Sequence, residues 1–230
     1  MEPDHNTQLR QAMVEVVALH AQAAREHLGK DALDPRVLRA MATVPRHEFV
    51  PVEIRPYAYA DQPLPIGWNK TISQPFIAAV MADLLDLQPV DSVLEIGTGL
   101  GYHAAVLASV AGRVFSVEVV EELGMAAQRN LARLGFGSVK LRIGDGTRGW
   151  PEHAPFDKIV VAAGSELIPP MLLQQLKPGG RMVLPTGTAE AQELMVVTKN
   201  AAGKTSIRGV MPVRFAMLEA ADEGRVHRAS

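Results

Sequence analysis

Hydrophobic and polar positions divide the chain into three regions. Residues 76–218 alternate short apolar runs with amphipathic segments, which is typical of a parallel sheet whose strands are joined by helical crossovers. Residues 7–45 have a helical pattern, and a second short helix is predicted near 35–42, with Asp34 as its N-cap before a first-turn proline. Residues 46–75, rich in proline and aromatic side chains, predict an irregular segment.

Apolar runs predict the strands of the sheet. Four strands are expected at 93–96, 113–117, 139–143 and 156–162; the first and fourth are apolar runs typical of buried strands, and the third has alternating apolar positions. A helix end near Leu176, a Pro-Gly-Gly turn and a fifth strand to Leu184 follow, with late strands at 194–199 and 209–218. The predicted fold class is α/β, with a doubly wound, mostly parallel seven-stranded sheet and an N-terminal helical extension. We expect a helical, substrate-proximal segment over 1–75, a core over 76–220 and a flexible charged tail over 221–230.

A glycine-rich turn follows the first predicted buried strand. It reads Val93-Leu-Glu-Ile-Gly-Thr-Gly-Leu-Gly-Tyr102, and a helix-compatible segment continues to Ser109. Glycines there allow a sharp turn and close approach of the backbone to a ligand at the helix N-terminus. Gly97, Gly99 and Gly101 are spaced differently from the dinucleotide fingerprint G-x-G-x-x-G. Acidic-x-G-x-G-x-G is instead the pattern of S-adenosylmethionine (SAM) methyltransferases, although a plain glycine-rich turn would also explain it.

Two further acids stand where a nucleoside would need acceptors. Glu118 closes the strand 113–117, roughly 20 residues after the glycine turn begins, and an acid there can accept hydrogen bonds from both ribose hydroxyls. The alternative for Glu118 is a helix N-terminal acid favoured by the helix dipole. Asp145, in Gly144-Asp-Gly146 after the strand 139–143, can accept from the adenine amino group or serve only as a turn residue.

Composition narrows the class of protein. The 230 residues can form one sizeable α/β domain, and 23 basic residues against 25 acidic ones leave no basic footprint for nucleic acid. The absence of cysteine excludes disulfides and thiol catalysis and favours a reducing compartment. The seven histidines lack metal-ligand spacing, so no metal site is indicated. With a polar N-terminus and no membrane-length apolar run, we expect a soluble cytoplasmic protein.

The segment before the sheet carries the most specific motifs. They are Val44-Pro-Arg-His-Glu-Phe-Val-Pro51, Tyr57-Ala-Tyr-Ala-Asp61, Leu64-Pro-Ile-Gly67 and Thr71-Ile-Ser-Gln-Pro75, joined later by Gly144-Asp-Gly146 and Val213-Arg-Phe215. With the glycine turn, they resemble the protein-L-isoaspartate O-methyltransferase family from about Asp34 to Leu218. The sequence departs from the usual family pattern at Asn69-Lys70, where glycine and a glutamine or glutamate are more usual, and at Ala162-Ala-Gly-Ser165, where Ala-Ala-Pro is more usual. Its first helix is also longer.

The resemblance implies a SAM cofactor, isoaspartyl proteins and peptides as substrates, and the following site. Cofactor-binding residues would be Thr71, Ile72, Gln74, Glu95, Gly97, Thr98, Gly99, Gly101, Tyr102, Glu118, Asp145 and Gly146. Ser73 would be the catalytic, substrate-orienting hydroxyl, although a serine before Gln74-Pro75 is also a good helix N-cap. Asp61, Arg46 and Arg214 are the other substrate-binding candidates. Asp61 would act from behind the residues that contact the substrate or serve only as a turn residue, and both arginines could instead form surface salt bridges.

Three functions remain open from the sequence. The first is repair of isoaspartyl damage in many proteins. The second is the same methyl transfer to one dedicated peptide, and the third is a SAM-binding protein without catalysis. No nucleic-acid or membrane partner is expected, and a monomer is favoured. A carboxylate is already ionised at pH 7, so methyl transfer to it requires no strong general base.

Overall fold

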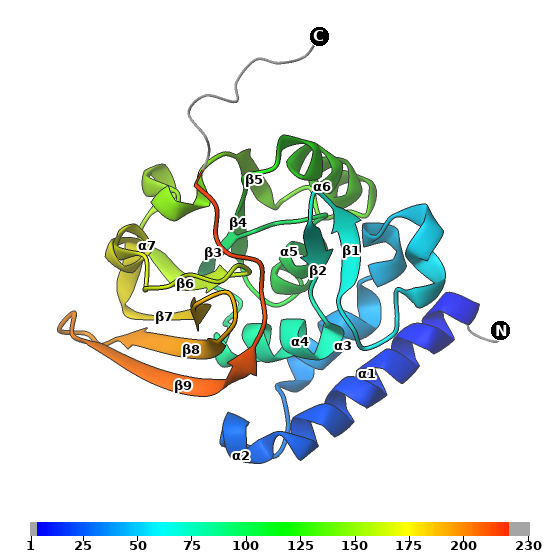
Figure 1. The fold of residues 1–230 in the computed structure, drawn as a ribbon, viewed down its shortest axis with the longest axis horizontal. Coiled ribbons are helices and arrows are strands. Elements are labelled where there is room, and N and C mark those ends of the chain that lie inside the picture. Colours follow the sequence, from blue (N-terminus) through cyan, green and yellow to red (C-terminus); the bar gives the residue numbers. More distant parts are fainter. Residues whose placement is uncertain (1–3, 221–230) are drawn as a thin grey trace, which may run out of the picture.

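A seven-stranded sheet forms the centre of the protein in the computed structural model, which describes residues 4–220 (Figure 1). The strands of this sheet are β3 (Ser92–Ile96), β4 (Arg113–Glu118), β5 (Lys140–Ile143), β6 (Phe156–Val161), β7 (Leu176–Gly187), β8 (Gln192–Lys199) and β9 (Thr205–Val213). The helices are α1 (His5–Ala23), α2 (Arg25–Leu28), α3 (Pro35–Thr43), α4 (Pro75–Leu84), α5 (Tyr102–Ala108), α6 (Glu121–Arg133) and α7 (Pro170–Gln175). The predicted fold class is confirmed.

The order of the strands places a crevice beside β3. The order is β5-β4-β3-β6-β7-β8-β9, with parallel pairing from β5 to β7 and antiparallel pairing of β7 with β8 and β8 with β9. The chain moves outward from β3 in one direction and returns to build β6 on its other side. In open parallel sheets, ligands bind at such a reversal, beyond the carboxyl ends of the strands.

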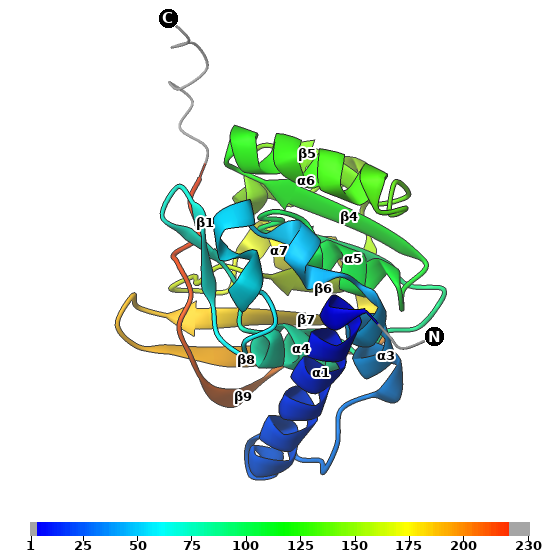
Figure 2. The ribbon, with the colours of Figure 1, turned by 90° about the vertical axis from the view of Figure 1, so that its right-hand side faces the viewer.

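The two faces of the sheet bury different side chains. Val93 belongs to the core under α4 and α5, whereas Leu94 and Ile96 point into the core on the opposite face, with α7. This assignment follows from the two-residue period of a strand. Figure 2 shows α1 running along the outside of the helical layer, where it contacts α3 and α4. The N-terminal extension therefore supports the sheet through other helices.

The segment before the sheet is more ordered than its composition predicts. The helical pattern of 7–45 is interrupted between α2 and α3, and the Asp34 carboxylate accepts from the Arg36 N–H at 2.7 Å, which confirms the predicted cap. The irregular segment contains two 3₁₀ helices (Arg46–Phe49 and Val52–Tyr57) and a hairpin of β1 (Leu64–Gly67) with β2 (Lys70–Ile72). The turn of this hairpin holds Trp68 and Asn69 at positive φ, which short hairpin turns require.

The last strand is displaced from its predicted position. It occupies Thr205–Val213, not 209–218, because Val213 pairs with Gln192, the first residue of β8, which leaves the following residues no partner on that strand. Residues 214–219, called the strap below, cross the carboxyl ends of the central strands, and Figure 1 shows this segment in red. Backbone bonds of Gly164 with Ala216 and Leu218 hold the strap in place. The predicted tail 221–230 lies outside the described residues.

Candidate active site

A cavity of about 310 Å³ opens at the carboxyl ends of the central strands. Its wall is formed by the β1–β2 hairpin and the start of α4, the glycine turn, the ends of β4 and β6, and the strap. Segments from both halves of the sequence therefore meet around one space. Its size is within the range of small-molecule sites in proteins.

The glycine turn forms one side of this cavity. Gly97, Gly99 and Gly101 have φ angles of 92°, 57° and 98°, a region that residues with a Cβ rarely adopt. Gly97 and Gly99 line the cavity. Gly101 does not; a Cβ there would lie 3.1 Å from Leu131 Cγ on α6, so this glycine permits close packing of two helices. The turn is therefore shaped for close backbone approach by a ligand at its first two glycines.

Glu118 lies at the end of β4, facing the same space. Its Oε2 accepts from the Gly99 N–H at 2.7 Å, and its Oε1 accepts from the Val120 N–H at 3.0 Å. Burial raises the pKa of this carboxyl above its ordinary value of 4.5, against the lowering effect of the two backbone hydrogen bonds. Both sequence-based interpretations find support, since Glu118 lines the cavity and also binds an amide just before α6.

Two other residues expected at the cofactor, Glu95 and Thr98, lie behind the turn. Glu95 is fully buried, and its carboxylate accepts from the Ser116 hydroxyl at 2.5 Å and pairs with His103 Nδ1 at 3.0 Å. The Thr98 and Ser116 hydroxyls are also 2.5 Å apart. Glu95 and Thr98 thus support the glycine turn from behind, outside the cavity wall.

The sequence predicts cofactor binding by both Asp145 and Gly146, but only Gly146 lines the cavity. Gly146 lines the cavity, and a Cβ there would collide with the Ile96 side chain. The Asp145 carboxylate instead accepts from the N–H and the hydroxyl of Thr147 and caps a 3₁₀ turn. The turn alternative for Asp145 is therefore realised in this structure. Its oxygens keep further acceptor capacity toward a ligand.

Ser73 faces the cavity but does not cap α4. The expected N-cap role is wrong: α4 begins at Pro75 after Gln74, and its Phe76 N–H donates to Asp61 Oδ1 at 2.8 Å. No hydrogen bond of the Ser73 hydroxyl is found among the described residues, although the Ser73 carbonyl accepts from Arg46. The half-buried hydroxyl is therefore available to a substrate.

Asp61 is committed to the helix start and does not line the cavity. Besides the Phe76 N–H, it accepts from Gln74 Nε2 at 2.9 Å and contacts His20 Nδ1 at 2.6 Å. This long-range cap replaces the local one, because a carboxylate on a preceding loop reaches the free amides of α4. Asp61 is therefore more than a turn residue. It lies outside the cavity wall and acts on the site indirectly, through Gln74 and the start of α4, so direct substrate contact is not what this structure shows.

Arg46 is buried behind the cavity wall, which contradicts both a surface salt bridge and direct substrate contact. Its guanidinium donates to the Ala58 carbonyl at 2.9 Å and to the Ser73 carbonyl at 2.7 Å, and it lies 4.8 Å from the centre of the Tyr102 ring. Burial lowers the pKa of Arg46 to about 10 and raises that of Tyr102 to about 12. Tyr102 too lies outside the wall, so this pair supports Ser73 from the interior.

Of the remaining predicted residues, all but Ile72 line the cavity. Thr71 and Gln74 line it, whereas Ile72 points into the core. Arg214 on the strap is exposed, lines the cavity and has no ion-pair partner within residues 4–220. Sequence reasoning missed Lys70 and Glu219, whose side chains meet across the opening with Nζ and Oε1 2.6 Å apart. No local signal marks this pair, because the two residues are 149 positions apart.

Comparison with known proteins decides the family. The model of the protein-L-isoaspartate(D-aspartate) O-methyltransferase family matches residues 22–223. This chain belongs to that family. A relative named protein-L-isoaspartate O-methyltransferase 1, from Polaromonas sp. strain JS666, is 56% identical over 97% of this chain and 94% of its own length. One from Syntrophobacter fumaroxidans, named protein-L-isoaspartate O-methyltransferase 2, is 52% identical over 91% and 85%.

Solved structures agree with this assignment. A protein-L-isoaspartate O-methyltransferase superposes with a TM-score of 0.78 at 28% identity, over 92% of this chain and 66% of that chain. A Plasmodium falciparum protein of the same description, in complex with S-adenosyl-L-homocysteine, has the same fold with a TM-score of 0.74 at 22% identity, over 91% and 98% of the two chains. As a protein-L-isoaspartate O-methyltransferase family member, the chain takes SAM as its cofactor.

Two departures from the family pattern acquire a structural meaning. Gly164, in Ala162-Ala-Gly-Ser165, donates its N–H to the Ala216 carbonyl of the strap at 2.8 Å, which a proline could not do. Lys70 faces Glu219, also on the strap. Both departures therefore concern how the strap is held. Within residues 4–220, no helix is long and apolar enough to cross a membrane, and no cluster of three or more potential metal ligands occurs.

Proposed function

We propose that this protein transfers a methyl group from SAM to the free carboxylate of isoaspartyl residues in proteins and peptides. The observation that carries the proposal is one cavity lined by the glycine turn and Glu118 on one side and by Ser73 and Arg214 on the other. Family membership gives this arrangement its chemical interpretation. The first side would bind the nucleoside of the cofactor, and the second would bind the acidic substrate.

The residues present fit the cofactor. Positive-φ glycines leave room for close approach, and a buried carboxylate at the end of the second parallel strand can accept from ribose hydroxyls. When bound, SAM supplies an electrophilic methyl group on a sulfonium: a C–O bond forms as the S–C bond breaks, leaving a methyl ester and S-adenosylhomocysteine. The ester later permits succinimide closure and partial return to aspartate.

The roles of the protein's own groups follow from this chemistry. The substrate carboxylate is ionised at neutral pH, so no residue must remove a proton. The Ser73 hydroxyl would donate to one oxygen of that carboxylate and leave the other in line for attack. Arg214 would balance its charge, and the strap and hairpin would exclude water from the reacting atoms.

The proposal includes general repair in the cytoplasm, not service to one dedicated peptide. The open side of the cavity is formed by an exposed hairpin and the strap, without an additional recognition domain among residues 4–220. Such an opening can admit one residue of many different chains. A cysteine-free sequence and the use of SAM are both compatible with the reducing interior of a cell. A SAM-binding protein without catalysis would have no need of the free Ser73 hydroxyl.

A matched pair of peptides tests the function. The protein is incubated with methyl-labelled SAM and two peptides that differ only in isoaspartate or aspartate at one position. We expect strong preference for the isoaspartyl peptide, and loss of most of that label in Ser73→Ala. Equal labelling of both peptides, or SAM binding with labelling of neither, would contradict the proposal. Several isoaspartyl peptides of unrelated sequence distinguish general repair from a dedicated substrate.

A further inference from the structure

The charged groups around the cavity are few and unevenly placed. Among residues 4–220, four ionisable side chains line the cavity, namely Lys70, Glu118, Arg214 and Glu219. Glu118, at the end of β4, lies on the cofactor side, where its carboxylate accepts a hydrogen bond from the Gly99 N–H of the glycine turn. The other three come from β2 and the strap, so two cations and one acid surround the substrate side.

Only one of these cations is needed for the substrate's free carboxylate. Arg214 has no ion-pair partner within the described residues and is available for that purpose. Lys70 is already paired with Glu219, with Nζ and Oε1 2.6 Å apart. The structure thus contains a second cation at the opening, matched by an acid that belongs to the protein itself.

The Lys70–Glu219 ion pair contributes little to stability, and another acid can replace Glu219 in it. Exposed ion pairs contribute little to stability, since water and salt screen them. The Glu219 side chain is 60% exposed, and it lies beyond Leu218, whose N–H makes the last backbone bond of the strap to Gly164. Glu219 can therefore leave without breaking the strap's attachment.

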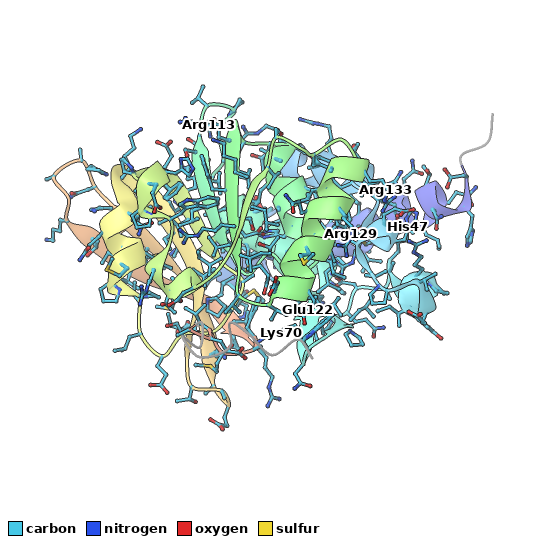
Figure 3. All side chains as sticks on the ribbon, turned by 90° about the horizontal axis from the view of Figure 1, so that it is seen from above. His47, Lys70, Arg113, Glu122, Arg129 and Arg133 are labelled. Atoms are coloured by element: carbon cyan, nitrogen blue, oxygen red, sulfur yellow. The ribbon has the colours of Figure 1, made fainter. Side chains whose placement is uncertain are left out.

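Lys70 would remain when Glu219 leaves. Its side chain is only 19% exposed, and β2 holds its backbone in the hairpin with β1. Figure 3 labels Lys70 next to Glu122, from the first turn of α6, in the view from above. An ammonium that is largely covered and anchored at its base presents a fixed charge to whatever enters the cavity.

We propose that Lys70 is a specificity-determining residue that favours isoaspartyl substrates with an acidic side chain next to the isoaspartyl residue. Glu219 occupies the position of that acid until the substrate displaces it. This inference rests on the proposed function. It assigns to Lys70 a contact with the neighbouring residue of the substrate and leaves the isoaspartyl carboxylate to Ser73 and Arg214.

Three isoaspartyl peptides that differ at one neighbouring position test the inference. The position carries Gln, Glu or Lys, and two sets place it before or after the isoaspartyl residue. We expect wild-type protein at low salt to favour Glu over Gln by about two- to fivefold in kcat/KM in at least one set, and less at high salt. In Lys70→Gln the ratio should fall to about one, and in Glu219→Gln it should rise, because the competing acid is gone.

Control variants separate this inference from its alternatives. Arg214→Gln should weaken all three peptides together and keep their ratio, because it acts on the shared carboxylate. The double exchange Lys70→Glu with Glu219→Lys restores an ion pair with reversed charges. If the ion pair only holds the strap closed, this double variant should regain the wild-type preference for the Glu peptide over the Gln peptide, and that result would overturn the inference. An unchanged Glu-to-Gln ratio of kcat/KM in Lys70→Gln would also overturn it. If no isoaspartyl peptide is methylated, the proposed function itself fails.

Discussion

The two sides of the cavity are built in different ways. The cofactor side consists of buried strand ends and a glycine turn, where Glu95, Thr98 and Ser116 form a continuous buried hydrogen-bond network. The substrate side consists of a hairpin and a strap, held by a few backbone bonds and one exposed ion pair. One side is fixed by the packed core of the sheet, and the other is assembled from segments at its periphery.

This difference fits the chemistry of the two ligands. SAM is the same molecule in every turnover, so its site does not need to adapt to different ligands. A preorganised site also avoids the entropy loss of ordering protein groups when the cofactor binds. An isoaspartyl residue occurs in many sequence contexts, and a weakly held opening can admit them. On the substrate side, Ser73 is supported from the interior through the bond from Arg46 to its carbonyl, and Gln74 through its bond to Asp61.

The largest expected effect tests that interior support. Arg46→Ala should lower the free energy of unfolding by about 3 kcal/mol, because two buried carbonyls lose charged donors. Arg46→Lys should recover only part, since an ammonium cannot reproduce the two-pronged guanidinium geometry. Urea denaturation measures both, with the exposed Arg39→Ala as control. A loss below about 1 kcal/mol would mean that the substrate side needs no interior support.

The next effect concerns the cofactor side. Glu118→Ala should weaken SAM binding by about 1.5–3 kcal/mol, roughly 10- to 150-fold, through loss of charge-assisted hydrogen bonds to ribose and of the bond that holds Gly99. Calorimetric titration measures the affinity. Glu122→Ala, in the exposed first turn of α6, is the matched control and should bind SAM normally. Unchanged affinity in Glu118→Ala would reduce Glu118 to a helix-terminal acid.

A third pair of variants separates support from chemistry within the substrate side. Ser73→Ala should lower turnover at saturating substrate on the order of tenfold or more, because the hydrogen bond to the substrate is lost. It should change the free energy of unfolding by less than about 0.5 kcal/mol. Asp61→Asn should show the opposite pattern, losing about 1 kcal/mol of stability because it weakens the cap of α4. Melting temperature and turnover are measured on both. A marked stability loss in Ser73→Ala would show that its hydroxyl supports the fold.

The smallest effect is a pH dependence of cofactor affinity. Burial raises the pKa of Glu118 above 4.5, and the ionised form is the better acceptor for ribose hydroxyls. SAM affinity should therefore fall, by about 1 kcal/mol or less, as the pH is lowered through that raised pKa, and be constant above it. Titration calorimetry across this range measures the change. Glu118→Gln cannot titrate, so an acid decrease of the same size in that variant would assign it to another group.

Much of the cofactor side could be predicted from the sequence alone. Apolar runs located β3, β4 and β6, because strands buried on both faces leave little choice of composition, whereas the edge strand β5 was located by its alternating apolar positions and has no fully buried residue. The glycine turn and Glu118 followed from their places at strand ends, since the carboxyl ends of parallel strands share one edge of a sheet. Whether Glu118 contacts ribose stays a prediction.

Only the tertiary structure decided the substrate side. The cap of α4 comes from Asp61 instead of Ser73, Arg46 is buried instead of exposed, and the strap begins where β8 offers no further partner. Lys70 and Glu219 meet although 149 positions separate them. Local patterns report on the backbone and on burial along one element. The partner of a polar side chain depends on which distant segment the packed fold brings within hydrogen-bonding distance.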